Sequence, residues 1–182
     1  MARFSLDEIE KIKSVKVFLS ICATGKTYLA SMDSRFVDID KEEAMYKFDY
    51  DKYMSYEELS KLQGHGVVVR KDSEDFIHKK LIEHIKNGRL VLSATHRHIL
   101  RFLAEEKIPY VIFQYPASDV QSFWQRMRAR GNSEDFIERM LEHREEAYCK
   151  HKKDENAVAV LDIYKDEYLS DLLWEVFGKP QK

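Results

Sequence analysis

The residues with the clearest chemical meaning are Gly25, Lys26 and Thr27, which end the stretch "VFLSICATGKT" at residues 17–27. A lysine that follows a turn of small residues can reach the β- and γ-phosphates of a nucleotide, and the next hydroxyl can ligate Mg²⁺. An apolar run precedes the turn, and a helix beginning at Lys26 would add its N–H groups and dipole to an anion site. The stretch therefore predicts a phosphate-binding loop over residues 20–27.

One position departs from the usual form of such a loop. Five residues before Gly25, where a glycine normally stands, the chain has Ser20. A positive φ would be costly for serine, but its side chain is small enough for close approach of the backbone. The alternative is an ordinary strand-to-helix turn with an exposed lysine. We expect a reshaped but working loop, whose nucleotide-binding residues are Ser20, Ala23, Thr24, Gly25, Lys26 and Thr27.

Two acidic residues lie in "FVDIDKEE", residues 36–43. Asp38 and Asp40 alternate at the end of a predicted strand, so both would lie on one side of it. In an open α/β sheet the carboxyl ends of the strands face the ligand crevice. Either carboxylate could orient an acceptor hydroxyl or hold Mg²⁺ through water, and both are candidate catalytic residues. The alternative is a solvated strand end that caps a helix.

A third group of chemically active side chains lies in "QRMRARGNSEDFIERMLEHREE", residues 125–146. Two predicted helices joined by a Gly-Asn-Ser turn carry Arg126, Arg128, Arg130, Arg139 and Arg144. Arginines on such a hairpin could cover phosphates and exclude water, which makes residues 118–150 a candidate lid. The alternative is surface charge paired with nearby glutamates at i,i+4 spacing. The candidate catalytic arginines are Arg126, Arg130 and Arg139.

The elements that must position these groups alternate along the chain. Short runs rich in β-branched and aromatic residues predict strands over residues 15–20, 36–40, 89–93, 110–114 and 157–161. Amphipathic stretches predict helices over residues 73–87, 98–107, 118–131, 133–150 and 167–177. The spacing of Ser118 and Gln121 indicates a capping box at the third of these helices. Alternating strands and helices predict a parallel sheet covered on both faces.

Length and composition set limits on the kind of protein. The 182 residues fit a single domain over residues 1–182, and a net charge of −2 gives no general attraction to nucleic acid. The two cysteines, Cys22 and Cys149, form no disulfide framework. The first twenty residues mix charges and lack the apolar core of a signal peptide, and no run is long enough for a membrane span. We therefore expect a cytoplasmic protein with no membrane partner.

The seven histidines suggest a metal site only weakly. They show no tight spacing with carboxylates or cysteines along the chain. His96 and His98 alternate on an extended backbone, but the sequence offers no third ligand beside them. We expect no dedicated metal site from this spacing. The histidines are His65, His78, His84, His96, His98, His143 and His151.

Taken together, the loop and the arginine-rich segment resemble the P-loop nucleoside monophosphate kinases. The local likeness is greatest to guanylate kinases over residues 110–146, with a strand, a Pro-x-Ser turn, an arginine-bearing helix, an Arg-Gly turn and a second helix. The resemblance implies a three-layer α/β/α fold with a five-stranded parallel sheet and a helical lid. It also implies that Arg126 and Arg139, with Arg130 beside them, approach the transferring phosphate.

The resemblance also concerns the residues that would bind the phosphoryl acceptor. In the related adenylate kinases an arginine after the third strand binds the acceptor phosphate, and Arg97 in "SATHR", residues 93–97, takes a similar place. Residues 41–75 are the candidate acceptor-binding region, with Arg70 as a further candidate ligand. The set of residues that selects guanine is not reproduced there. The base specificity of the family therefore does not transfer.

These observations lead to one main hypothesis and two alternatives. The main one is an ATP- and Mg²⁺-dependent phosphotransferase, most simply a nucleoside or deoxynucleoside monophosphate kinase, acting as a monomer or homodimer on a small nucleotide. One alternative is a nucleotide-binding regulatory module without catalysis. The other is a kinase of a non-nucleotide or polynucleotide hydroxyl. Near-neutral charge disfavours long nucleic acids as partners.

Overall fold

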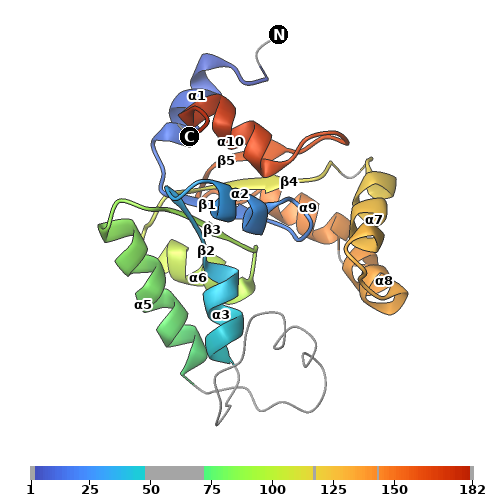
Figure 1. Cartoon of the computed structure of the whole chain (residues 1–182), viewed down its shortest axis with the longest axis horizontal. Coiled ribbons are helices and arrows are strands. Elements are labelled where there is room, and N and C mark those ends of the chain that lie inside the picture. Colours follow the sequence, from blue (N-terminus) through green and yellow to red (C-terminus); the bar gives the residue numbers. More distant parts are fainter. Residues whose placement is uncertain (1–2, 48–71, 117, 143, 181–182) are drawn as a thin grey trace.

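The computed structural model describes residues 3–47, 72–116, 118–142 and 144–180. Five parallel strands form one sheet in the order β2-β3-β1-β4-β5 (Figure 1). The predicted α/β fold with a five-stranded parallel sheet is confirmed. The strands are β1 (Val17–Ser20), β2 (Phe36–Asp38), β3 (Leu90–Ser93), β4 (Tyr110–Gln114) and β5 (Ala157–Asp162).

Helices cover both faces of the sheet, as alternation of side chains along the strands requires. Phe18 packs with α1, α2 and α10, whereas its neighbours Val17 and Leu19 pack with α3, α5 and α6 on the other face. Figure 1 shows α1 and α10 above the sheet, and α5 and α6 below it. These helices are α1 (Leu6–Lys13), α2 (Lys26–Met32), α3 (Ile39–Lys47), α5 (Ser73–Lys86), α6 (Arg97–Glu105) and α10 (Leu169–Phe177).

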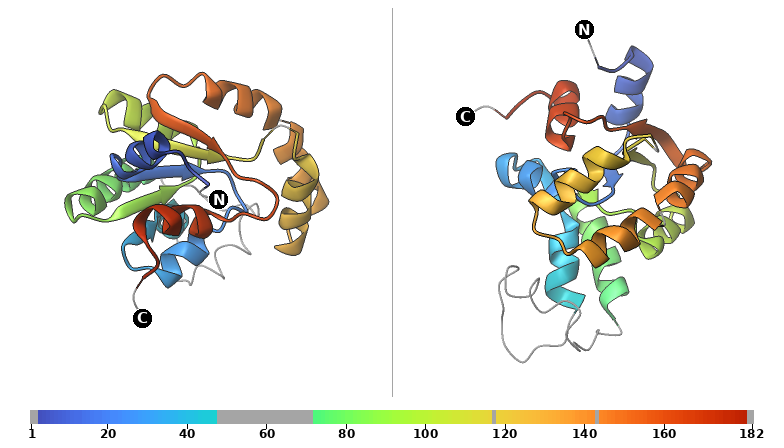
Figure 2. Two further views of the ribbon diagram at one scale, coloured as in Figure 1. Left: turned by 90° about the horizontal axis from the view of Figure 1, so that it is seen from above. Right: turned by 90° about the vertical axis from the view of Figure 1, so that its right-hand side faces the viewer.

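The candidate lid forms a separate pair of helices at one end of the molecule. Helices α7 (Val120–Ala129) and α8 (Glu134–Glu142) pack against each other, and α9 (Arg144–Lys152) leads back to β5. Figure 2 shows α7 and α8 at the end opposite α5. The helix predicted over residues 133–150 is helical in its described parts, which form α8 and α9 on either side of residue 143. Among the described residues, no helix has the length and apolarity to cross a membrane.

Local capping groups explain three further differences from the predicted elements. Strand β2 ends at Asp38, and Asp40 lies in the first turn of α3 instead of on the strand. The Asp38 side chain accepts a hydrogen bond from the Asp40 N–H at 3.2 Å and so ends the strand. Helix α7 is capped by Asp119 and not by the predicted Ser118. Helix α1, which the sequence analysis did not predict, begins with a Ser5–Glu8 capping box.

Candidate active site

The phosphate loop joins β1 to α2 and contains two residues with left-handed backbone. Gly25 has φ 91°, where a side chain would be strained, and Ala23 has φ 60°, which is uncommon for a residue other than glycine. Ser20 is the last residue of β1 and has extended backbone. The positive φ angles of this loop therefore fall after Ser20, so serine at this position carries no backbone penalty.

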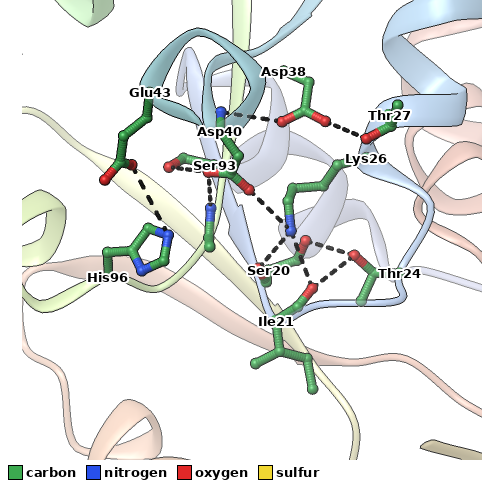
Figure 3. Close-up of polar contacts among 11 residues, drawn as sticks. Ser20, Ile21, Thr24, Lys26, Thr27, Asp38, Asp40, Glu43, Ser93 and His96 are labelled. Atoms are coloured by element: carbon green, nitrogen blue, oxygen red, sulfur yellow. Dashed lines mark hydrogen bonds and ion pairs between the residues drawn. The ribbon is translucent and has the colours of Figure 1, made fainter. Parts of the chain in front are cut away.

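Ser20 also contributes a contact that glycine could not make. Its Oγ lies 2.8 Å from Thr24 Oγ1, and both side chains are buried. Because the Thr24 hydroxyl donates its hydrogen to the Ile21 carbonyl at 3.0 Å, the Ser20 hydroxyl is the donor of the first bond. Figure 3 shows these contacts closing the loop on itself. Serine in place of the usual glycine at position 20 thus gives up backbone flexibility and adds a hydrogen bond within the loop.

Lys26 lies inside this loop instead of reaching into solvent. Only 8% of its side chain is exposed. The Nζ atom donates hydrogen bonds to the carbonyls of Ser20 at 3.0 Å and Ile21 at 3.1 Å, and it lies 3.4 Å from Asp40 Oδ2. The lysine is therefore buried, and not exposed as the alternative of an ordinary turn expected. The ammonium group is held by the oxygen atoms of two loop carbonyls and of the Asp40 carboxylate.

Two carboxylates from the β2–α3 junction meet the loop. Thr27 Oγ1 donates a hydrogen bond of 2.6 Å to Asp38 Oδ2. Burial raises the pKa of the Asp38 carboxyl above its usual range, and the nearby charge of Asp40 raises it further. Asp40 Oδ1 accepts hydrogen bonds from Ser93 Oγ at 3.0 Å and from the Ala94 N–H at 2.8 Å. The structure thus brings Asp38 and Asp40 to the predicted loop.

A further carboxylate and two imidazoles lie beside Asp38 and Asp40, farther from the loop. Glu43 lies one turn after Asp40 on α3, and Oε1 of Glu43 lies 3.2 Å from His98 Nε2. His96 occupies the N-cap position of α6, and its Nε2 lies 3.9 Å from Glu43 Oε2. The sequence pattern predicts a strand over residues 36–40 and so does not bring Glu43 next to Asp40, whereas in the structure α3 starts at Ile39. With a helix starting at Ile39, the i,i+3 spacing would have placed Asp40 and Glu43 on one face.

Arg126 supports the phosphate loop from the side of α7. Its guanidinium donates hydrogen bonds to Tyr115 Oη at 2.9 Å, to the Glu167 carbonyl at 2.8 Å and to the Lys165 carbonyl, and it lies 4.1 Å from the centre of the Tyr168 ring. The Tyr115 hydroxyl donates to the Ala23 carbonyl at 3.0 Å. Burial raises the pKa of Tyr115 to about 12, so this hydroxyl remains a donor at neutral pH.

The segment before α10 also reaches the loop through its backbone. The Leu169 N–H donates to the Thr24 carbonyl at 2.9 Å. The Tyr168 ring lies so close to Gly25 that a Cβ added there would approach its Cδ1 to 3.4 Å. Tyr168 and Leu169 therefore form the floor of the loop together with Tyr115. This floor comes from parts of the chain that sequence reasoning did not connect with the phosphate site.

The other predicted arginines lie in different surroundings. Arg130 is exposed at the end of α7, and its charge lowers the pKa of the Cys22 thiol, although burial raises that pKa more strongly. Arg139 is exposed and donates to the Asp135 carbonyl of its own helix at 3.2 Å. Arg97 is exposed in the first turn of α6. Arg70 and residues 48–71 of the predicted acceptor region lie outside the described residues.

Comparisons with known proteins find distant structural similarity but no sequence relative. No protein-family model matches the chain, and no curated protein sequence matches it. A solved structure of a gluconokinase from Sinorhizobium meliloti 1021 is similar with a TM-score of 0.47 and 14% sequence identity. The match covers 88% of this chain and 87% of that chain. The similarity thus extends along most of both chains at low identity.

Proposed function

We propose that the chain is an ATP- and Mg²⁺-dependent phosphotransferase that acts on a small molecule. The observation that carries this proposal is the convergence of Lys26 and Thr27 with two carboxylates from the β2–α3 junction. Lys26 Nζ lies 3.4 Å from Asp40, and Thr27 Oγ1 lies 2.6 Å from Asp38. A phosphoryl-transfer site needs these three things together: a cation for the phosphates, oxygen ligands for Mg²⁺ and a carboxylate for the acceptor.

The residues present fit both cofactors. Mg²⁺ prefers oxygen ligands, and the Thr27 hydroxyl and the Asp38 carboxylate provide two at one place. These two residues would hold the ion directly or through water. Lys26 and the loop over residues 20–27 would hold the phosphates of ATP. When bound, Mg²⁺ neutralises charge on the phosphate oxygens.

Side chains of this protein would stabilise the transferring group, orient the acceptor and take its proton. Lys26 would exchange its carbonyl partners for phosphate oxygens and stabilise the charge that develops during transfer. Asp40 Oδ2, which faces Lys26, would orient the acceptor and take its proton where the acceptor is a hydroxyl. The new bond joins the acceptor oxygen to the γ-phosphorus, while the bond to the bridging oxygen of ADP breaks. Arg130 and Arg139 would reach the transferring group only after movement of α7 and α8.

Two classes of acceptor have separate support. A nucleoside or deoxynucleoside monophosphate is the first candidate, and the resemblance of residues 110–146 to guanylate kinases supports it. A hydroxyl of a non-nucleotide molecule is the second candidate. It is supported by three carboxylates, Asp38, Asp40 and Glu43, on the described part of the acceptor side, since these would repel a phosphate group.

A panel of acceptors tests the proposal and separates the two classes. Nucleoside monophosphates, deoxynucleoside monophosphates, nucleosides and neutral polyols would each be offered with ATP and Mg²⁺, and ADP formation would be measured. Lys26→Ala serves as the inactive control. A chain that binds ATP but forms no ADP with any acceptor would support the regulatory-module alternative. A chain that does not bind ATP would overturn both the proposal and that alternative.

A further inference from the structure

We propose that Asp40, Glu43 and His96 form a binding site for a divalent transition-metal ion, with Zn²⁺ as the preferred ion. One ligand atom of each residue lies within 4.8 Å of the others. Asp40 and Glu43 lie on consecutive turns of α3, and His96 precedes α6 at the carboxyl end of β3. Along the sequence no further ligand stands beside His96, whereas the fold brings two carboxylates to it. This site shares Asp40 with the proposed phosphotransferase, but zinc binding does not depend on that function.

The distance between Glu43 and His96 suits a shared metal ion better than a direct hydrogen bond. Glu43 Oε2 and His96 Nε2 are 3.9 Å apart, which is too long for a hydrogen bond. Zinc ligands lie about 2.0–2.2 Å from the ion, so two ligand atoms in a tetrahedral site are roughly 3.3–3.6 Å apart. The Glu43–His96 pair would close by a few tenths of an ångström. The His96 side chain is 48% exposed and therefore has room to turn toward the carboxylates.

Neighbouring side chains already orient both carboxylates. Ser93 Oγ donates to Asp40 Oδ1 at 3.0 Å, and Glu43 Oε1 lies 3.2 Å from His98 Nε2. His98 is held in turn, because its Nδ1 lies 3.3 Å from His78 Nε2. Figure 3 shows Ser93 bonded to Asp40, and Glu43 facing His96 beside them. Such outer partners are characteristic of metal sites, where they fix the direction of the ligands.

The chemistry of the three ligands selects the ion. Mg²⁺ prefers oxygen ligands, whereas imidazole nitrogen is a good ligand for zinc and its neighbours. Affinities for a given set of ligands rise from Mn²⁺ to Cu²⁺ and fall again at Zn²⁺, so the ligand set favours Zn²⁺ over Mn²⁺, and Cu²⁺ is the competitor to compare with it. Three protein ligands leave a fourth position open in a tetrahedral site, as in catalytic rather than structural zinc sites. An oxygen atom of a small ligand could occupy that position.

Lys26 provides a way to test the electrostatics of the site. Its ammonium group lies 3.4 Å from Asp40 Oδ2 and opposes a second cation there. Lys26→Ala should therefore bind Zn²⁺ more tightly than the wild-type chain. If the proposed function is correct, movement of Lys26 to nucleotide phosphates would have the same effect. That last expectation rests on the proposed function, while the effect of Lys26→Ala does not.

The direct experiment is calorimetric titration of Zn²⁺ into the full chain at neutral pH, with excess Mg²⁺ present. We expect one site, with affinity reduced about 100-fold or more in Glu43→Gln and in His96→Ala, since loss of an outer partner alone costs about 10- to 100-fold. His98→Ala should lower the affinity about tenfold, because it leaves Glu43 less well oriented. Thermal unfolding should show stabilisation by Zn²⁺ in the wild type, and this stabilisation should be lost in Glu43→Gln.

A matched control uses another imidazole–carboxylate pair that involves α3. His84 Nε2 lies 3.0 Å from Glu42 Oε1, and His84 does not belong to the proposed site. His84→Ala should leave zinc affinity unchanged. Equal zinc affinity in the wild type and in a Glu43→Gln, His96→Ala double variant would overturn the proposal, as would a loss of affinity in His84→Ala as large as in His96→Ala. Failure of phosphoryl transfer would leave the titration result standing, so the two proposals fail separately.

Discussion

The phosphate loop and the wall of carboxylates and imidazoles opposite it are built in different ways. The loop is closed mainly by contacts among residues 20–26, such as the bond between Ser20 and Thr24. The wall combines residues of the β2–α3 junction with residues at and after the end of β3. Its members are Asp38, Asp40, Glu43, Ser93, His96 and His98. The loop can therefore keep its shape through local contacts, whereas the wall depends on the packing of helices and strands.

Lys26 and Thr27 are residues at which the two regions meet, Thr27 through its hydrogen bond to Asp38 and Lys26 through Asp40. Its ammonium group contacts two loop carbonyls and the Asp40 carboxylate of the wall. We expect changes in the loop to act mainly on ATP affinity and changes in the wall to act mainly on turnover. Lys26 should affect both. Four substitutions test this division, and they follow from the largest expected effect to the smallest.

Lys26→Ala should lower turnover by at least about 10³-fold, because it removes the cation that would stabilise the transferring phosphoryl group. ADP formation at saturating acceptor measures this loss, and thermal unfolding checks that the chain remains folded. Lys79→Ala, which removes an exposed lysine from α5, is the control and should retain full turnover. Undiminished turnover in Lys26→Ala would contradict the assignment of the loop.

Asp40→Asn should lower turnover about 10²-fold and leave ATP affinity nearly unchanged, because removal of a general base has an effect of this order. Asparagine keeps an oxygen that can accept from Ser93 and Ala94, so the wall should retain its shape. The measurements are kcat and the Kd for ATP in the same preparation. If the affinity for ATP falls as much as kcat, the division between loop and wall is wrong.

Arg139→Ala should lower kcat about tenfold if α7 and α8 close over the site, since a hydrogen bond to a charged group contributes about 1.5 kcal/mol or more. The same change should leave the stability of the chain nearly unaltered, because Arg139 is exposed. Arg128→Ala is the control, because Arg128 is already paired with Glu134 at 2.6 Å. Equal kcat in Arg139→Ala and wild type would argue against a catalytic lid arginine at this position.

Tyr115→Phe should weaken ATP binding by a factor of about 2 to 10, because it removes one hydrogen bond to the Ala23 carbonyl, worth about 0.5–1.5 kcal/mol. At saturating ATP, kcat should be unchanged. Tyr110→Phe is a matched control, because Tyr110 is also buried but donates to Asp154, far along the chain from the loop. A loss of ATP affinity in both variants would indicate a general effect on stability.

The sequence predicted features that depend on neighbouring residues. The five strands follow from apolar runs, and the loop follows from Gly25-Lys26-Thr27 between a strand and a helix. Features that join distant segments were missed. Arg126 was expected in a lid, yet it contacts the carbonyls of Lys165 and Glu167, about forty residues away. No periodicity or spacing in the sequence records such a contact.

The wall was predicted only in part, because some of its residues come from distant segments of the chain. Asp38 and Asp40 were identified from their position at the end of a strand, although Asp40 lies in the first turn of α3. Glu43 was missed because this boundary was placed too late. Its neighbours His96 and His98 are more than fifty residues away along the chain, so only packing of α6 near α3 brings them together.

The bond between Ser20 and Thr24 has a consequence for protein engineering. A consensus-based redesign would replace Ser20 with glycine, since glycine is the usual residue at this position. Such a repair would remove a buried hydrogen bond worth about 1 kcal/mol and add backbone freedom to the unfolded chain at a further cost of roughly 0.5–1 kcal/mol. The unusual residue is thus matched to its threonine partner, and a search pattern that demands glycine would overlook loops built on this pairing.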